Sequence, residues 1–420
     1  MKPLLLSYSD TIGGASRATL RLHHALKAHG VDIRMRVGVK TTDINTIDDA
    51  ANKLNNMFSR ARPHIGQLIM QLQKSNDQSS GSPNYLNSGM VKKLNASEFD
   101  LFNIHWVNNE FLSIEDIGRL RKPVILTLHD MWAFCGTEHY APGNATARWR
   151  SGYTSENRLS KHSGIDLDLW TWTRKQKFWT KPMQIITPSH WLAECVKSSK
   201  LMHDWPVSVI PNPLDTKKYQ KWPKGLARSI LGLPQETPLI MFGAIGGGKD
   251  QRKGWDLLES ALRIMGMEKD IECVVFGQSE PKERPKFEQL THWLGHINDD
   301  ATLALLYSAA DVMVVPSRQE NLPQSATEAQ ACGCPVVAFN CTGMPEVVEH
   351  MKTGYLATAY DIEDLAQGIL WVLNDIDRYK ELSNNATIRA AALWSSDKIA
   401  AKYLEVYAAA INKHQIGSAH

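Results

Sequence analysis

Two glutamates in the carboxyl-terminal half of the chain have the spacing and the surroundings of a ligand site. Glu320 and Glu328 lie eight positions apart. An apolar run at 312–315 predicts a buried parallel strand before Glu320, and a helix is expected from about 325 to 332. Glu320 therefore falls at the carboxyl end of a strand, where open α/β sheets bind ligands. Carboxylates there can accept hydrogen bonds from sugar hydroxyls, whereas the alternative interpretation is two solvated acids.

A glycine-rich basic loop is the second candidate site. The sequence GAIGGGKDQRKG at 243–254 follows an apolar run that predicts a strand. Its glycines let the backbone approach a diphosphate closely, and Lys249, Arg252 and Lys253 supply positive charge. The loop lacks the GKS or GKT ending of a P-loop. A solvated basic loop remains the alternative, above all for Lys249.

A pair of glycines marks a similar place near the amino terminus. Gly13 and Gly14 stand between a predicted strand at 3–8 and a predicted helix at about 15–29. They permit a phosphate or a sugar to approach the helix start, and the alternative is a tight strand-to-helix turn. The pair is not the GxGxxG of dinucleotide-binding folds, so the sequence disfavours an oxidoreductase.

Histidines follow two further predicted strands of the amino-terminal half. His105 comes after a strand at 99–104, and His129 after a strand at 123–128. Active sites form where the carboxyl ends of parallel strands gather. An imidazole near its ordinary pKa can hydrogen-bond a sugar or steer a leaving phosphate. A structural histidine at a strand end is the alternative for both residues.

Two longer strings carry a family resemblance. PSRQENLPQSATEAQACGCPVV at 316–337 and TLHDMWAFCGTEHY at 127–140 resemble segments of the retaining, nucleotide-sugar-dependent glycosyltransferases of family four, which have the GT-B fold. Glu320 and Glu328 match the E-x7-E motif of that family in type and spacing. The resemblance extends over nearly the whole chain.

The resemblance implies a donor site in the carboxyl-terminal half. Glu320 would contact the donor sugar, and Glu328 would bind the ribose of the nucleotide. Asn321 and Leu322 would offer backbone N–H groups to the diphosphate or to the sugar. These roles come from the family pattern and not from the spacing of the residues alone.

The resemblance also assigns the cations of the glycine-rich loop. Lys253 would neutralise the leaving diphosphate. The family usually carries an arginine after the first glycine of this loop, where the present chain has Ala244. Either Arg252 or Lys249 takes over the work of that arginine, or the diphosphate is held less tightly.

Three further contacts follow from the same resemblance. His129 would lie near the reacting carbon of the donor, and the Gly13–Gly14 loop would face the crevice between two domains. Turns at Gly277 and at Ile297 would cradle the base through backbone groups, which leave no readable code for the identity of the base.

Alternating strand and helix patterns in both halves predict an α/β fold with doubly wound parallel sheets. With the resemblance, this becomes a GT-B fold of two Rossmann-like domains that face a cleft. We expect an acceptor-binding domain at 1–200, a nucleotide-sugar-binding domain at 201–390, and a terminal helix within 391–420 that crosses back to the first domain.

Composition restricts the partners of the protein. The chain has 420 residues and a formal charge of +3, which is too small to indicate nucleic-acid binding by itself. Six scattered cysteines without a CxxC pair, together with no expected leader or membrane span, predict reduced thiols and a cytoplasmic location. A basic amphipathic segment at 52–74 could rest on the inner face of a membrane, or it could pack on its own domain.

The predicted function is retaining sugar transfer from a nucleoside-diphosphate sugar to a glycan or lipid-linked glycan, in capsule, O-antigen or exopolysaccharide biosynthesis. No metal is expected because cations stabilise the leaving group, and the nucleotide sugar is a co-substrate rather than a bound cofactor. Two alternatives stay open. One is a nucleotide-sugar epimerase on the same fold, and the other is a non-catalytic GT-B scaffold, which the departure at Ala244 favours mildly.

Overall fold

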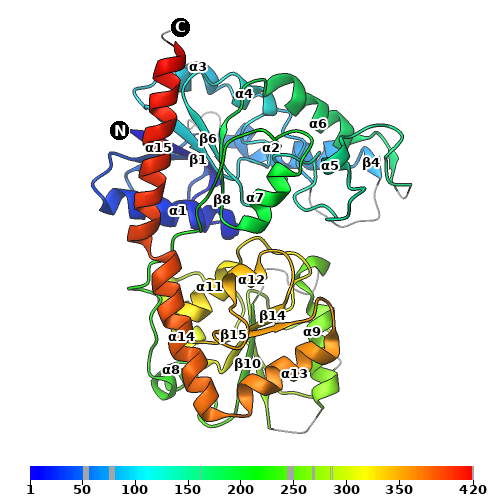
Figure 1. The fold of residues 1–420 in the computed structure, drawn as a ribbon, viewed down its shortest axis with the longest axis vertical. Coiled ribbons are helices and arrows are strands. Elements are labelled where there is room, and N and C mark those ends of the chain that lie inside the picture. The colour runs from blue at the N-terminus through cyan, green and yellow to red at the C-terminus, as the bar shows by residue number, and fades with distance from the viewer. Residues whose placement is uncertain are drawn as a thin grey trace. The chain divides into compact units, whose positions relative to one another are not determined.

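Two parallel sheets organise the protein (Figure 1). The computed structural model describes residues 1–50, 56–74, 81–160, 162–243, 250–266, 270–283, 285 and 287–418. The chain divides into unit 1, made of Met1–Pro213 and Asp397–His420, and unit 2, Leu214–Ser396. The predicted boundaries at 200 and 390 lie before the structural ones, because a last strand of the first sheet and the end of a long helix follow them.

The sheet of unit 1 has the strand order β3-β2-β1-β5-β6-β8-β9, with parallel neighbours throughout. The order reverses between β1 and β5, so the loops after these two strands lie beside each other. The strands are β1 (Pro3–Ser9), β2 (Arg34–Val39), β3 (Ile47–Asp49), β5 (Leu101–Ile104), β6 (Val124–Thr127), β8 (Gln184–Thr187) and β9 (Val207–Val209).

Helices cover both faces of this sheet (Figure 1). Because side chains alternate along a strand, Leu5 packs on one face while Leu4 and Leu6 pack on the other. The helices of unit 1 before its last are α1 (Gly13–Ala28), α2 (Asn56–Met70), α3 (Val91–Asn95), α4 (Ile114–Gly118), α5 (Arg148–Ser151), α6 (Leu167–Phe178) and α7 (His190–Lys197), and a small antiparallel pair joins β4 (Gln73–Lys74) to β7 (Ser163–Gly164).

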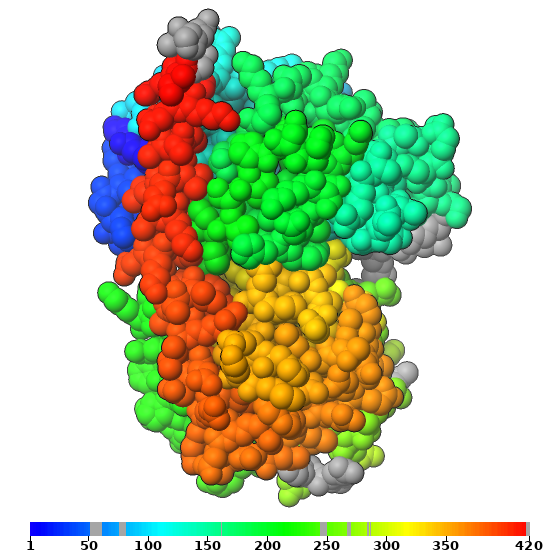
Figure 2. All heavy atoms as spheres, in the orientation of Figure 1, coloured from blue at the N-terminus to red at the C-terminus, as the bar shows by residue number. Residues whose placement is uncertain are grey.

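The terminal helix α15 (Ser396–Ser418) returns to unit 1, as the sequence predicted. Its buried Ile399, Tyr403 and Tyr407 join the core of the sheet face that holds Leu5. Asn103 of β5 donates a hydrogen bond from Nδ2 to the hydroxyl of Tyr407 at 2.7 Å. Figure 2 shows α15 in red as a continuous ridge on this unit. The apolar stripe of α15 and one buried polar contact thus fix it to the sheet.

The sheet of unit 2 has the order β12-β11-β10-β13-β14-β15, again all parallel. This order reverses between β10 and β13, the place where doubly wound sheets bind their ligands. The strands are β10 (Leu239–Gly243), β11 (Glu272–Phe276), β12 (Thr291–Trp293), β13 (Val312–Val315), β14 (Val336–Phe339) and β15 (Gly354–Ala357).

Both faces of the second sheet are buried, which explains the continuous apolar runs of its strands. Met313 and Val315 pack on one face, and Val312 and Val314 pack on the other. The helices are α8 (Lys224–Leu231), α9 (Trp255–Met265), α10 (Asp300–Ala309), α11 (Gln324–Ala331), α12 (Met344–Val347), α13 (Ile362–Leu373) and α14 (Ile376–Trp394), with a 3-10 turn at Gln251–Lys253 before α9.

The predicted amphipathic segment at 52–74 contains α2 and β4, and its residues 52–55 lie outside the described part of the chain. Leu68 and Leu72 are 61% and 50% exposed. Arg62, however, is buried and donates hydrogen bonds to the carbonyl oxygens of Glu110, Asn87 and Leu86. Arg62 therefore holds the helix on its own unit and does not present a charge to lipid. In the described part of the chain, no helix combines the length and apolarity that crossing a bilayer requires.

We predict that Tyr407→Phe destabilises unit 1 by about 1–3 kcal/mol, because the Asn103 amide then loses its acceptor inside the core. The matched control is Tyr85→Phe, the same chemical change on a ring of unit 1 that is 52% exposed. Urea unfolding followed by circular dichroism measures both variants. Equal stabilities of the two variants would refute a stabilising role for the buried hydrogen bond.

Candidate functional site

The two stretches that the sequence singled out in unit 2 meet at the reversal of the strand order. Lys253 follows β10 and Glu320 follows β13, and these strands are neighbours in the sheet. Nζ of Lys253 lies 2.5 Å from Oε1 of Glu320, and Nη1 of Arg252 lies 3.3 Å from the same oxygen. The hydroxyl of Ser317 donates to this oxygen at 3.1 Å. A buried carboxylate thus receives two cations and a hydroxyl.

The backbone brings the two loops into direct contact. Gly254 has φ +70°, and a Cβ there would lie 1.9 Å from the carbonyl oxygen of Pro316. Only glycine allows that approach, so Lys253 reaches Glu320 because residue 254 has no side chain. Beside it, the N–H of Arg318 donates to the carbonyl oxygen of Arg252 at 2.8 Å.

The pairing keeps Glu320 ionised although only 6% of the residue is exposed. Burial alone would raise the pKa of Glu320, but Lys253 and then Arg252 outweigh it and hold that pKa below its ordinary value. Asp250 accepts a hydrogen bond from the Arg252 guanidinium at 3.1 Å and so orients it. At neutral pH the site holds fixed positive charge beside a fixed negative charge.

The remaining predicted residues of this loop and helix are also buried. Asn321 and Leu322 follow Glu320 directly, with 3% and 7% exposure. Glu328 lies in α11, 3% exposed, and its Oε2 accepts a hydrogen bond from the hydroxyl of Tyr307 at 2.9 Å. Tyr307 of α10 was not predicted, since nothing in its local sequence marks it. The two glutamates occupy separate hydrogen-bonding environments within one unit.

The other turns predicted for the base sit at the same edge of the sheet. Gly277 follows β11, and its N–H donates to the carbonyl oxygen of Gly295, beyond β12, at 2.7 Å. Ile297 is half-buried and packs against the core of unit 2. Ala244 and Lys249 lie outside the described residues. That Arg252 or Lys249 replaces the usual arginine therefore stays a prediction.

The turn at Thr342 and Gly343, which was not predicted from the sequence, is hydrogen-bonded to the Glu320 loop. The N–H of Glu320 donates to Oγ1 of Thr342 at 3.0 Å, and the N–H of Gly343 donates to the carbonyl oxygen of Glu320 at 3.0 Å. These residues follow β14, the neighbour of β13. Their position just after a strand was the one available signal, because threonine and glycine carry no charge that would attract notice.

In unit 1, Gly13 and Gly14 are the first two residues of α1, which begins two positions before the predicted helix start. The carboxylate of Asp10 shapes the loop before them. It accepts hydrogen bonds from the N–H and hydroxyl groups of Thr41 and Thr42, at 2.8 to 3.0 Å. The loop is therefore tied to the turn after β2, and the helix start is held in place.

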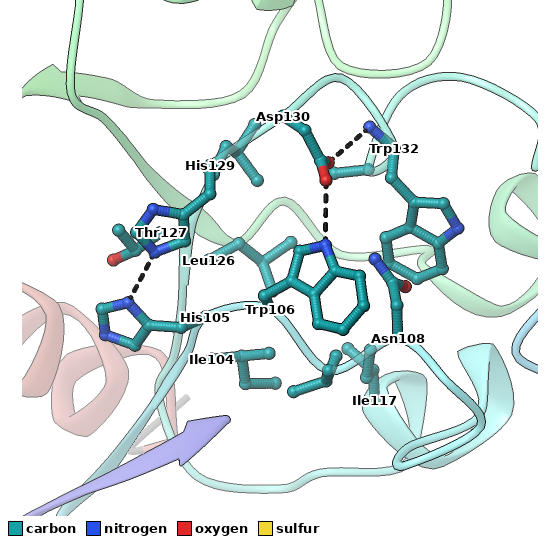
Figure 3. Close-up of a pocket in the computed structure, with 13 residues that line it drawn as sticks. Ile104, His105, Trp106, Asn108, Ile117, Leu126, Thr127, His129, Asp130 and Trp132 are labelled. Atoms are coloured by element: carbon teal, nitrogen blue, oxygen red, sulfur yellow. Dashed lines mark hydrogen bonds between the residues drawn. The ribbon is translucent and has the colours of Figure 1, made fainter. Parts of the chain in front are cut away.

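His105 and His129 come together because β5 and β6 are neighbours. Nδ1 of His105 lies 3.0 Å from Nε2 of His129, so one of the two nitrogens carries the shared proton (Figure 3). Burial lowers the pKa of His129 from 6.5 to about 4. Burial and the neighbouring imidazole lower the pKa of His105 well below its ordinary value. Both rings are neutral at pH 7, which suits hydrogen bonding rather than charge stabilisation.

Asp130 fixes the backbone directly after His129. It accepts hydrogen bonds from Nε1 of Trp106 at 3.0 Å, from Nδ1 of His139 at 2.6 Å and from the N–H of Trp132 at 3.0 Å. Together with the histidine pair it lines a small pocket of about 20 Å³, the room of one water molecule (Figure 3). His139 in turn lies 2.9 Å from the hydroxyl of Ser82.

Ser82, His139 and Asp130 are hydrogen-bonded in the same order as the serine, histidine and aspartate of a catalytic triad. Ser82 and His139 are only 5% and 7% exposed. Their burial favours a structural role in which the network orients Trp106 and the stretch that carries His129.

We predict that His129→Gln reduces the loss of stability in acid. The unfolded chain binds protons at pH values between about 6.5 and about 4 that folded His129 does not bind, so wild-type stability falls over this window as pH decreases. The variant lacks this loss, which is at most about 3 kcal/mol. Melting temperatures across the window measure it, with His296→Gln, an exposed histidine, as control. Parallel curves for wild type and His129→Gln would contradict a lowered pKa.

Family comparisons agree with this geometry. Residues 12–218 match the family described as Glycosyltransferase Family 4, and residues 234–389 match the family described as Glycosyl transferases group 1. A D-inositol 3-phosphate glycosyltransferase of Thermobispora bispora is 30% identical over 223 residues, which are 49% of this chain and 51% of that protein. The chain thus spans about half the length of the curated relatives it matches.

Solved structures resemble the whole chain. Sucrose-phosphate synthase of Thermosynechococcus elongatus superimposes with a TM-score of 0.68 and 20% identity, covering 100% of both chains. HepE of Anabaena, solved in complex with UDP and glucose, gives a TM-score of 0.65 and 19% identity over 97% of this chain and 100% of its own. Two glycosyltransferase families therefore match the two halves of the chain, and its fold is the GT-B fold of glycosyltransferases.

Proposed function

We propose that the protein is a retaining glycosyltransferase that moves a sugar from a nucleoside-diphosphate sugar to a glycan or lipid-linked glycan acceptor. Unit 2 binds the donor in this proposal, and unit 1 binds the acceptor. The observation that carries it is the meeting of Lys253, Arg252 and Glu320 at the strand reversal of unit 2. A role in polysaccharide biosynthesis belongs to the proposal as the function that the family resemblance implies.

The cations of this cluster suit a leaving diphosphate. Sugar transfer builds negative charge on the departing phosphate oxygen, and preorganised cations stabilise such charge without reorganisation. Lys253 and Arg252 are held in place by Glu320 and by Asp250 before any ligand arrives. These two side chains do the work that a metal ion does in other transferases, so we propose a metal-independent reaction.

In the proposal, Glu320 and Glu328 bind different parts of the donor. Glu320 accepts hydrogen bonds from the sugar hydroxyls, and Glu328 accepts them from the ribose. As the bond from the anomeric carbon to the phosphate oxygen breaks, the acceptor oxygen bonds that carbon on the same face. The leaving phosphate oxygen takes the acceptor proton, which conserves the anomeric configuration and needs no nucleophilic side chain.

The nature of the donor and the place of the reaction are proposed from similarity. HepE, a solved structural neighbour, was crystallised with UDP and glucose, which supports a uridine donor as the first to test. The exposed Leu68 of α2 and Leu72 just after it support contact with a membrane that carries the acceptor, whereas the buried Arg62 argues for packing on unit 1. The proposed location is cytoplasmic, and contact with the inner membrane face is the alternative to packing of α2 on unit 1.

The first prediction concerns the donor. In a thermal-shift panel of UDP, GDP, ADP, TDP and their common sugars without added metal, one nucleotide class raises the melting temperature. A ligand at about a hundred times its Kd stabilises the native state by about 3 kcal/mol. An absence of any shift across the panel would overturn the donor assignment and favour a non-catalytic scaffold.

The second prediction separates sugar recognition from nucleotide binding. Glu320→Gln keeps the shape of the side chain but removes its charge, so transfer falls about a hundredfold while free-nucleotide affinity changes less than about threefold. Glu405→Gln, on the exposed surface of α15, is the matched control and leaves both unchanged. Equal losses of transfer and nucleotide binding in Glu320→Gln would refute the assigned role. Isomerisation of the donor sugar without an acceptor would favour an epimerase instead.

A further inference from the structure

Two non-glycine residues near the Glu320 loop have left-handed backbones. Thr342 has φ +51° and Tyr360 has φ +66°. This conformation is unfavourable for any residue with a Cβ, and for a β-branched threonine it is a true outlier. Such a backbone persists only where the surroundings over-determine it, and in proteins it clusters at functional sites.

Both residues use this backbone to hold the same loop. Oγ1 of Thr342 accepts from the N–H of Glu320 at 3.0 Å. The hydroxyl of Tyr360 donates to the carbonyl oxygen of Arg318 at 3.0 Å. Cys341, next to Thr342, points its Sγ at the same carbonyl from 3.6 Å. The turn after β14 and Tyr360, three residues after the end of β15, therefore hold the loop after β13.

Thr342 and Gly343 act on the two peptide groups that flank Glu320. Thr342 binds its N–H, and the N–H of Gly343 binds its carbonyl oxygen at 3.0 Å. A Cβ at residue 343 would lie 1.6 Å from the carbonyl oxygen of Asn321, so the two loops are in backbone contact. With both peptide groups held, φ and ψ of Glu320 are fixed, and so is the direction in which its side chain leaves the backbone.

We propose that Thr342 is a positioning residue for Glu320: the threonine hydroxyl, kept in place by an unfavourable backbone, fixes the direction in which the Glu320 side chain leaves the backbone toward the donor sugar. The inference rests on the proposed function for the binding of a donor sugar, but the positioning itself is a property of the free protein. The threonine acts through the peptide N–H of Glu320, while Lys253 and Arg252 contact the carboxylate itself.

Three variants separate the hydroxyl from the backbone conformation. Thr342→Ser keeps the hydroxyl, Thr342→Val keeps the branched shape without it, and Thr342→Gly removes both the hydroxyl and the unfavourable contact of Cβ. We expect Thr342→Val to weaken UDP-glucose binding about fivefold, the factor that one ordinary hydrogen bond is worth, with UDP binding nearly unchanged. Thr342→Ser should stay within about twofold of wild type for both probes.

The glycine variant distinguishes positioning from general support. Thr342→Gly should lose UDP-glucose affinity as Thr342→Val does, yet melt at a higher temperature than Thr342→Val because the backbone strain is relieved. A merely structural threonine would lose stability and binding together in both variants. Thr342→Val binding UDP-glucose as tightly as Thr342→Ser would overturn the inference, as would a glycine variant that melts with the valine variant.

Amide hydrogen exchange tests, without any ligand, whether Thr342 holds the peptide N–H of Glu320. The amide of Glu320 should exchange faster in Thr342→Val and Thr342→Gly than in wild type or Thr342→Ser, because its acceptor is lost. If wild-type protein bound neither UDP nor UDP-glucose, that result would count against the proposed donor. The exchange rate of the Glu320 amide would then decide by itself whether Thr342 positions Glu320. Unchanged exchange of that amide in the valine variant would refute the role of Thr342.

Discussion

A buried carboxylate cannot stay charged without partners, and this constraint shapes unit 2. Glu320 is almost entirely removed from water, and an isolated charge there would be costly. Lys253 and Arg252 compensate it from the neighbouring loop. For them to arrive, two loops must touch through their backbones, which Gly254 permits. Compensating the charge of Glu320 therefore requires the two ion pairs, a glycine at residue 254 and the neighbouring positions of β10 and β13.

The same carboxylate is also held through its peptide groups. Thr342 and Gly343 bind the N–H and the carbonyl oxygen of Glu320, so its orientation does not depend on the ion pairs alone. The peptide contacts fix the direction of the Cα–Cβ bond of Glu320, whereas Ser317, Lys253 and Arg252 hold the carboxylate itself. A ligand that takes over the cations would still find the side chain leaving the backbone in one direction. That division of labour is a form of preorganisation.

Unit 1 also buries titratable side chains, namely a histidine pair and Asp130. Its histidine pair is neutral because burial opposes protonation of either ring. Asp130 stays charged nearby, since His139 and the indole N–H of Trp106 hold its pKa below the ordinary value against the effect of burial. One end of the pocket thus offers neutral hydrogen-bonding groups, and the other holds a compensated charge. Tyr407 and Asn103 tie the terminal helix to the sheet that carries these residues.

The alternation of strands and helices and most strand positions could be predicted from the sequence, because apolar periodicity follows directly from burial. The return of the terminal helix was predicted from the family resemblance. It also marked Glu320 and Lys253, since charged residues at strand ends are conspicuous. It did not reveal β15 or α14, whose patterns are short or weakly amphipathic.

Which side chains meet one another could not be predicted from the sequence and is known from the fold. That Lys253 pairs with Glu320, that His105 shares a proton with His129, and that Tyr307 bonds Glu328 depend on strand order, which periodicity does not encode. Thr342 was invisible for a further reason. Its role lies in a backbone angle and a contact to a peptide N–H, and neither leaves a pattern in the residue letters.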